Sequence, residues 1–226
     1  NELHRRGLSF GGRTLVFGPV GTDFEGFVYH IAVEVPVKLI TVRTSFIPSA
    51  PQEMVDLVRM AVESTKRNSP ALLHIPGLDL LSSVSHHMSS AIKSELEQIT
   101  WDDDETLVVA SSTRPESIDP SLMSAFDRTV ILASPNTADR ENLMGHLLKG
   151  RADLQPAVIA ELTEGWSFTD LRHLAASLFL STPIEKAPKP RDVLEEMIAR
   201  SGVLPVGRSD VLRQIGSVGN VHSPGR

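Results

Sequence analysis

The chain has 226 residues and a mass of 24.6 kDa, which suits one large domain or one domain with a small companion. Its 41% hydrophobic and 22% charged residues are typical of globular proteins and argue against a disordered, fibrous or membrane chain. A net charge of −6 gives no general footprint for nucleic acid or an anionic membrane. The absence of cysteine excludes disulfides, thiol nucleophiles and cysteine metal sites, and it favours a cytoplasmic location.

Short apolar runs alternate with helical patterns over the first 135 or so residues. Each run is a continuous apolar stretch of the kind that is buried on both faces of a parallel sheet. The stretches between the runs are long enough for crossover helices, and residues 55–67 and 83–99 carry apolar side chains at helical spacing. We therefore predict an α/β fold with a parallel five-stranded sheet, its strands at residues 14–18, 38–43, 71–75, 106–111 and 129–133.

After Ser134 the strand signal ends and successive helices are predicted, at residues 138–149, 156–163, 169–180 and 191–199. Thr137 and Thr169, each followed closely by an acidic residue, are the predicted N-caps of two of them. The sequence thus predicts three parts: an α/β subdomain over residues 1–135, a helical lid subdomain over 136–205 and a linker or flexible tail over 206–226. Because the chain does not begin with Met and ends in a Gly/Ser-rich stretch, we interpret it as a segment of a longer protein.

The most informative segment is GPVGTDFE, residues 18–25, between the first predicted strand and a helix. Four more segments follow it in order: LLHIPGLD at 72–79, ASSTRPESIDPSLM at 110–123, FDR at 126–128 and EGWSFTDLRHL at 164–174. Together they resemble the landmarks of the AAA family of ATPases, whose usual forms include GPPGTGKT, ATNRPxxLDPALL and GFSGADL. The resemblance covers about residues 8–180. It implies a five-stranded P-loop domain followed by a small helical lid, usually assembled into a hexameric ring.

The P-loop itself departs from the form that its chemistry needs. A working P-loop uses glycines to bring backbone N–H groups to the phosphates, a lysine to reach the β- and γ-phosphates, and a hydroxyl to hold Mg²⁺. Gly18 and Gly21 remain, but Asp23, Phe24 and Glu25 stand at the final glycine, the lysine and the hydroxyl positions. We expect the two acidic residues to favour the start of the following helix and to take the place of the anion.

The remaining chemical positions implied by the resemblance are changed as well. Pro76 and Gly77 replace the two carboxylates that would hold Mg²⁺ and orient the attacking water. Asp79, at a later acidic position of that motif, is interpreted as a helix cap or turn residue. Thr113 stands at the asparagine position that senses the nucleotide, and the arginine fingers of the family are replaced by Ser124 and Ala125. We therefore expect no catalytic residues and no bound cofactor.

Three other features of the sequence bear on function. Phe46 and Ile47 follow the second predicted strand, where the family carries a pore-facing loop, so they are pore-loop candidates or local core residues. His74, His86 and His87 lack the spacing of metal ligands, so no metal site is expected. The acidic run at residues 101–105 is interpreted as a solvated loop.

These observations lead to one main hypothesis and two alternatives. The main one is a pseudo-ATPase, a degenerate AAA domain that serves as a structural ring layer or interaction module in a larger unfoldase or remodelling ATPase. The arrangement would resemble a tandem AAA protein of the valosin-containing-protein class, and the composition is compatible with an actinobacterial source and a protease partner such as a proteasome. The alternatives are an AAA domain that still binds or hydrolyses ATP at a rearranged site, and an adaptor that binds a protein partner without forming a ring.

Overall fold

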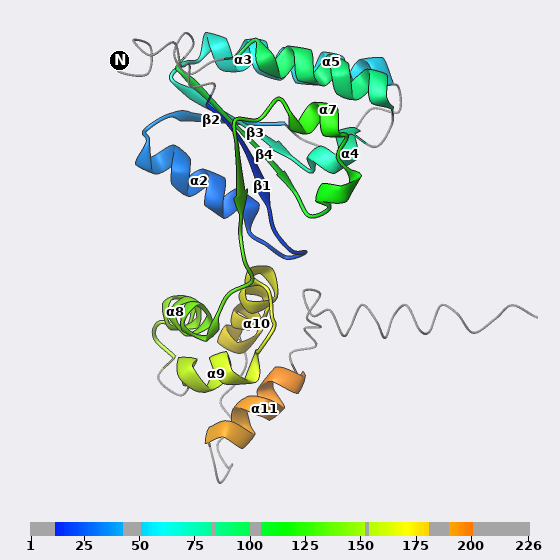
Figure 1. Cartoon of the computed structure of the whole chain (residues 1–226). Coiled ribbons are helices and arrows are strands. Elements are labelled where there is room, and N and C mark those ends of the chain that lie inside the picture. Colours follow the sequence, from blue (N-terminus) through cyan, green and yellow to red (C-terminus); the bar gives the residue numbers. More distant parts are fainter. Residues whose placement is uncertain are drawn as a thin grey trace, which may run out of the picture. The chain divides into compact units, whose positions relative to one another are not determined.

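A computed structural model describes residues 12–42, 51–82, 85–99, 105–151, 154–180 and 190–200. The chain forms two compact units (Figure 1). One contains the chain up to Gly18 together with Phe24–Leu132, and the other contains Pro19–Asp23 together with the chain from Ala133 onward. The short loop Pro19–Asp23 therefore belongs to the helical unit, although the strand before it and the helix after it belong to the sheet unit.

The sheet unit is built on five parallel strands in the order β2-β3-β4-β1-β5, which confirms the predicted α/β fold. The central strand β4 pairs with β1 and β3, so that Ala110 lies beside Leu15 on one side and Ile75 on the other. β2 and β5 form the edges. The strands are β1 (Arg13–Phe17), β2 (Lys38–Thr41), β3 (Ala71–Pro76), β4 (Thr106–Ser112) and β5 (Arg128–Ile131).

Helices cover both faces of this sheet. Successive side chains of a strand point to opposite faces, so Leu15 and Val16 enter two different apolar clusters. The Leu15 cluster is filled by α3 (Pro51–Arg67) and α5 (His86–Glu97), and the Val16 cluster is filled by α2 (Phe24–Glu34). Figure 1 shows α3 and α5 on one side of the strands and α2 on the other. This is why the strand sequences are apolar without alternation.

The helix predicted over residues 83–99 begins later than expected. Ser85 accepts a hydrogen bond from the Met88 backbone N–H at 3.2 Å, and this cap starts α5 at His86. A separate short helix, α4 (Leu78–Ser82), precedes it. The chain between β4 and β5 forms a 3-10 turn, η2 (Pro115–Ser117), and one further short helix, α7 (Pro120–Met123).

The second unit consists of helices around a core of its own. The helices are α8 (Thr137–Leu147), α9 (Pro156–Leu162), α10 (Phe168–Leu180) and α11 (Pro190–Arg200). Buried apolar side chains from α8, α9 and α10 and from the turns between them share this core: Met144, Leu148, Leu154, Ile159, Trp166, Leu171, Leu174, Ala175 and Leu178. We call the part of this unit that is built from these helices the lid.

The two N-caps predicted for the lid helices were wrong by one and two residues. Asn136 caps α8, and its side chain and that of Asp139 bond each other's backbone N–H groups at 3.0 Å. Ser167 precedes α10 and makes the same reciprocal pair with Asp170. Each true cap stands three residues before its acidic partner, which is the spacing of a capping box, whereas Thr137 and Thr169 lie inside the helices.

Several predicted features lie outside the described residues. They include the pore-loop candidates Phe46 and Ile47, residues 101–104 of the acidic run, most of the connector at 183–190, and the tail from residue 201. In the part of the chain that the structure describes, no helix is long and apolar enough to cross a membrane.

A histidine is buried inside the sheet unit. His74, on β3, is 1% exposed, and its Nε2 lies 3.3 Å from the Ser111 hydroxyl on β4. Burial penalises the charged imidazolium and lowers the pKa of His74 to about 4. The folded chain therefore holds this histidine neutral at a pH where an exposed histidine would take up a proton.

We predict that the stability of the sheet unit falls as the pH is lowered from about 6.5 to about 4. Over that range the unfolded chain binds a proton at His74 that the folded chain does not, so the free energy of unfolding drops by up to about 3 kcal/mol. Urea unfolding at a series of pH values measures this. His74→Gln should flatten the slope, whereas His146→Gln, at an exposed position of α8, should not. An unchanged slope in His74→Gln would contradict the assignment.

Candidate functional site

The loop after β1 forms a tight turn. The Thr22 backbone N–H donates to the Pro19 carbonyl at 3.0 Å, and the Thr22 hydroxyl donates to the same oxygen at 2.7 Å. Gly21 has a φ of +85°, a conformation that disfavours residues with a Cβ atom. The glycine that the P-loop resemblance retains therefore has a local backbone role here.

This turn packs directly on the start of α10. The Thr169 backbone N–H donates to the Gly21 carbonyl at 3.2 Å. A Cβ atom on Gly21 would overlap the Ser167 side chain, whose hydroxyl donates to the Asp170 carboxylate at 2.7 Å. Ser167 and Asp170 are 4% and 3% exposed, so Gly21 meets a surface of buried, hydrogen-bonded side chains.

Asp23 forms the second link between the loop and α10. Its Oδ2 lies 2.6 Å from Nη2 of Arg172, and the side chains of Asp23 and Arg172 are 23% and 52% exposed. Asp23 comes just before α2, and Glu25 lies exposed in the first turn of that helix. Both acidic residues therefore lie at the start of α2, where they were expected. Asp23 also forms an ion pair with Arg172 of α10.

Phe24, at the lysine position of the P-loop, packs inward. It is partly buried against the cluster of Val16, Val28, Leu72 and Val109 beneath α2. The side chain at this position is therefore part of the sheet unit's apolar core.

The second motif ends in a backbone turn with one buried acid. Pro76 is the last residue of β3, and Gly77 follows with a φ of +65°. Asp79 is 4% exposed and accepts hydrogen bonds from the Ser112 hydroxyl at 2.6 Å and from Arg114 Nη2 at 3.0 Å. Asp79 thus joins α4 to the end of β4, a larger role than the predicted cap or turn residue.

The other positions implied by the resemblance have ordinary surroundings. Thr113 is half-buried just after β4. Ser124, in place of an arginine finger, accepts from Lys93 at 2.8 Å and donates to the Ser121 carbonyl at 2.7 Å. Ala125, in place of the other finger, is 1% exposed.

The histidines do not assemble a metal site in the part of the chain that the structure describes, where no group of three potential ligands occurs. His86 Nδ1 lies 2.7 Å from Asp119, and His87 is exposed. Hydrogen bonds from Ser121 and His86 lower the pKa of Asp119 to about 2. This carboxylate caps α7 and stays charged throughout the physiological pH range.

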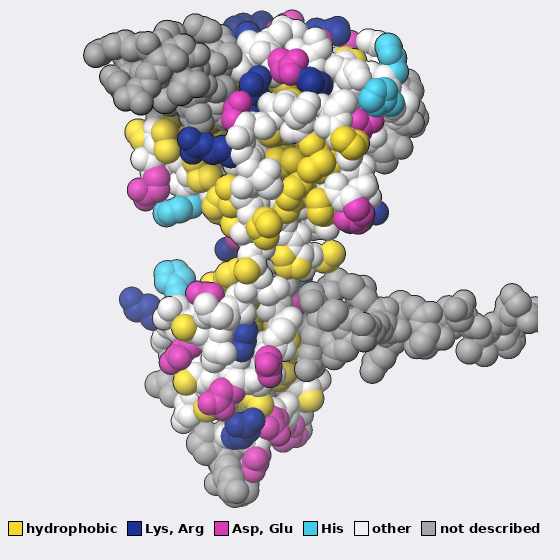
Figure 2. Space-filling view, viewed as in Figure 1, with side chains coloured by type: hydrophobic (Ala, Val, Ile, Leu, Met, Phe, Trp, Pro, Cys, Tyr) yellow, Lys and Arg dark blue, Asp and Glu magenta, His cyan; other side chains and the backbone are white. Residues whose placement is uncertain are grey.

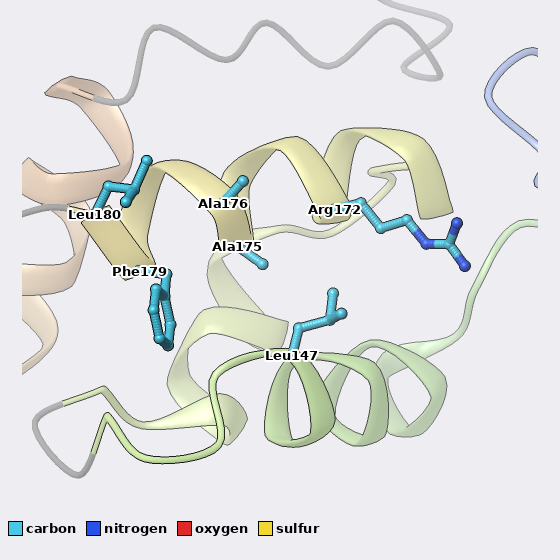
Figure 3. Close-up of a pocket in the computed structure, with 6 residues that line it drawn as sticks. All are labelled: Leu147, Arg172, Ala175, Ala176, Phe179 and Leu180. Carbon is cyan, nitrogen blue, oxygen red and sulfur yellow. The ribbon is translucent and has the colours of Figure 1, made fainter.

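The lid also carries an open apolar groove of about 440 Å³ (Figure 3). The groove is lined by Leu147 of α8 and by Arg172, Ala175, Ala176, Phe179 and Leu180 of α10. Figure 3 shows Ala175 and Phe179 pointing toward α8. Phe179 and Leu180 are 51% and 84% exposed. Figure 3 shows the Arg172 guanidinium extending away from Phe179 and Leu180. Figure 2 also shows an exposed apolar area on the sheet unit. On the edge strand β5, Ile131 is 78% exposed.

The segment GPVGTDFE that the sequence singles out is divided in the structure between the loop after β1 and the first turn of α2. Sequence reasoning missed Ser167 and Arg172 as partners of that loop. Both lie within the fifth landmark segment, EGWSFTDLRHL. The sequence shows Arg172 in that segment and Asp23 in the loop as oppositely charged residues. No local sequence rule pairs two residues that lie so far apart in the chain.

Comparison with known proteins identifies the family. Residues 14–134, just over half of the chain, match the family described as "ATPase family associated with various cellular activities (AAA)". The chain belongs to the AAA family. The match begins within β1 and ends just after β5, so it spans the whole sheet.

Similar proteins include the ATP-dependent zinc metalloprotease FtsH 2 of Bdellovibrio bacteriovorus, 28% identical over 76% of this chain and 31% of that protein. Fidgetin-like protein 1 of Caenorhabditis elegans is 30% identical over 71% of this chain and 29% of that protein. The chain thus spans about a third of the length of these relatives.

Solved AAA structures share the fold. A katanin structure described under "Structural Basis for Katanin Self-Assembly" matches 91% of this chain and 77% of its own, with a TM-score of 0.67 and 18% identity. The FIGL-1 AAA domain in complex with ADP matches 92% of this chain and 77% of its own, with a TM-score of 0.66 and 20% identity.

We predict that Gly21→Ala destabilises the chain more than Gly150→Ala. Both glycines have a positive φ, +85° and +98°, so both substitutions cost about 1 kcal/mol of backbone strain. Only Gly21 has an atom in the way of the new methyl group, because nothing lies within 4 Å of a Cβ on Gly150. We expect an extra loss of about 1–2 kcal/mol for Gly21→Ala, measured by urea unfolding. Equal losses would mean that the loop is not held against Ser167.

Proposed function

We propose that this chain is a pseudo-ATPase, a degenerate AAA domain that binds no ATP. It acts in the cytoplasm as a structural ring layer or interaction module of a larger AAA unfoldase or remodelling ATPase, and another domain of the parent chain hydrolyses ATP. The observation that carries the proposal is the packing of Phe24. The position that should present a cation to the phosphates presents an aromatic ring to the protein's own core.

The loop offers a triphosphate no compensating charge. Residues 18–25 contain no lysine or arginine and two carboxylates. Arg172, a cation that contacts the loop, already pairs with Asp23 at 2.6 Å. Without a basic group, the repulsion between the loop carboxylates and a phosphate chain is not offset. The residues present do not fit the nucleotide that the family implies.

The same holds for Mg²⁺ and for water activation. Pro76 offers no side-chain ligand and Gly77 has no side chain, so neither can bind a metal or orient a nucleophile. Asp79 is held by the Ser112 hydroxyl and Arg114, so its carboxylate oxygens are already engaged. No step of hydrolysis can be assigned to these side chains.

The parent protein and its partners are part of the proposal. The relatives are several times longer than the matched segment, and one of them is named a protease, which suits a module placed among other domains. The self-assembly named for the katanin structure supports a ring, built here by contacts between copies of the chain. The open apolar groove of the lid offers a surface for protein contacts. A tandem AAA parent with protein substrates, feeding a protease such as a proteasome, fits this picture.

One alternative has an observation in its favour. The FIGL-1 AAA domain, which shares this fold, was solved with ADP, and this chain retains Gly18 and Gly21 of the loop. A rearranged nucleotide site is therefore the second candidate function. An adaptor that binds a partner without a ring is the third, and the assembly measurement below separates it from the first.

We predict that the chain binds neither ATP nor ADP measurably in the presence of Mg²⁺. Isothermal titration calorimetry is the measurement. A micromolar dissociation constant would require about 8 kcal/mol of binding free energy from a loop without the charged groups that supply it. Binding of that strength would overturn the pseudo-ATPase proposal and favour the rearranged site.

A triple variant restores the glycine, lysine and hydroxyl positions of the P-loop and leaves the other changed positions as they are. Asp23→Gly, Phe24→Lys and Glu25→Thr together should allow weak nucleotide binding but no turnover, because Pro76, Gly77, Ser124 and Ala125 still lack the other groups. Turnover above background would point to Asp79 as a substitute carboxylate.

We predict that the isolated chain is mostly monomeric at tens of micromolar by analytical sedimentation. A ring without bound nucleotide at its boundaries depends on direct side-chain packing between copies, which is weak for one domain alone. In the parent protein a neighbouring ring raises the effective concentration to about the millimolar range and lets the same interface close. A parent protein that stays monomeric under every nucleotide condition would rule out the ring-layer role and leave the adaptor.

A further inference from the structure

The contacts of the loop with α10 form a small, self-contained set. The Thr169 N–H bonds the Gly21 carbonyl at 3.2 Å, and Arg172 pairs with Asp23 at 2.6 Å. Thr169 and Arg172 are three residues apart on α10 and therefore lie on the same side of the helix. The backbone contact and the ionic contact thus act at one place and support each other.

The chemistry of this set resembles that of a loop closed on a bound anion. A glycine-containing loop before a helix attracts negative charge through its backbone N–H groups, and a phosphate normally supplies it. Here the anion is part of the chain, because Asp23 lies in the loop itself. The counter-cation comes from the lid, because Arg172 projects from α10.

We propose that Asp23 and Arg172 form a latch that closes the loop Pro19–Asp23 on α10 without nucleotide. The inference rests on the proposed function, since a loop that bound ATP would not need an internal anion. With the latch, the folded chain keeps the loop closed on α10 without a ligand. In a nucleotide-binding loop, closure would depend on the bound nucleotide. The latch also engages the Arg172 guanidinium in an ion pair with Asp23. While the latch is closed, Arg172 cannot bind an incoming phosphate.

The amide of Thr169 reports on the latch. At the start of a helix this N–H has no partner within the helix, so its protection from solvent depends on the Gly21 carbonyl. Amide hydrogen exchange followed by NMR on the whole chain therefore measures how often the loop leaves α10. The Leu148 amide, which bonds Met144 within the lid, is the internal reference.

The variants reverse one charge at a time and then both. Asp23→Lys and Arg172→Glu should each speed exchange at Thr169 by about three- to tenfold and leave Leu148 unchanged. The double variant exchanges the two charges and should return Thr169 exchange to within about twofold of the original rate. Arg191→Glu is the matched control, because Arg191 forms an ion pair of the lid with Glu161 at 3.1 Å and is 55% exposed, close to the 52% of Arg172.

The outcomes separate the latch from the proposed function. Faster exchange in both single variants, recovery in the double variant and no change in Arg191→Glu support the latch. Unchanged Thr169 exchange in the single variants, or no recovery in the double variant, overturns the latch, and the failure of the unaltered chain to bind ATP would still stand. ATP binding that slows Thr169 exchange in the unaltered chain would overturn both, because closure would then depend on nucleotide.

Discussion

The approach of Gly21 to Ser167 is the constraint on which the arrangement of the loop depends. Because Gly21 has no Cβ atom, the backbone of the turn comes close enough for its carbonyl to accept from Thr169. Ser167 cannot move aside without losing its bonds to the buried Asp170, which fix the start of α10. The Asp23 to Arg172 ion pair follows from this geometry, since the turn delivers Asp23 to the side of α10 that carries Arg172. A surface ion pair by itself is worth too little to fold a loop.

Polar groups at the carboxyl end of β4 bond one another. Asp79 accepts hydrogen bonds from Ser112 and Arg114. These bonds satisfy groups that burial would otherwise penalise, which matters most for Asp79 at 4% exposure. A site that binds substrate needs polar groups with unused bonding capacity. Under the pseudo-ATPase proposal, the polar groups at this edge of the sheet serve internal contacts and not a nucleotide.

The sequence predicted the sheet well because its signal is local. Continuous apolar runs such as Leu107–Ala110 can be buried only between two layers, and each of the five strands appears within two residues of its predicted bounds. The helix starts at Thr137 and Thr169 were misplaced because a threonine before an acidic residue resembles a cap, and the competing Asn136 and Ser167 have the correct three-residue spacing. The ion pair of Asp23 with Arg172 could not be predicted from the sequence, since it depends on how the loop packs on α10. Loss of the P-loop lysine could be read from the sequence, but the burial of its replacement could not.

The burial of Phe24 bears on what a lysine at this position would cost. Phe24 contributes apolar area to the cluster beneath α2, so exchanging it for lysine removes about 1–2 kcal/mol of burial and brings a charge near Val16 and Val28. Removing the Asp23 carboxylate at the same time opens the ion pair with Arg172. Each step toward a working loop therefore lowers stability before any nucleotide binds to offset the loss. With native stability of only about 5–15 kcal/mol, such a path is disfavoured, and the loop is held in its present form by packing as well as by the missing chemistry.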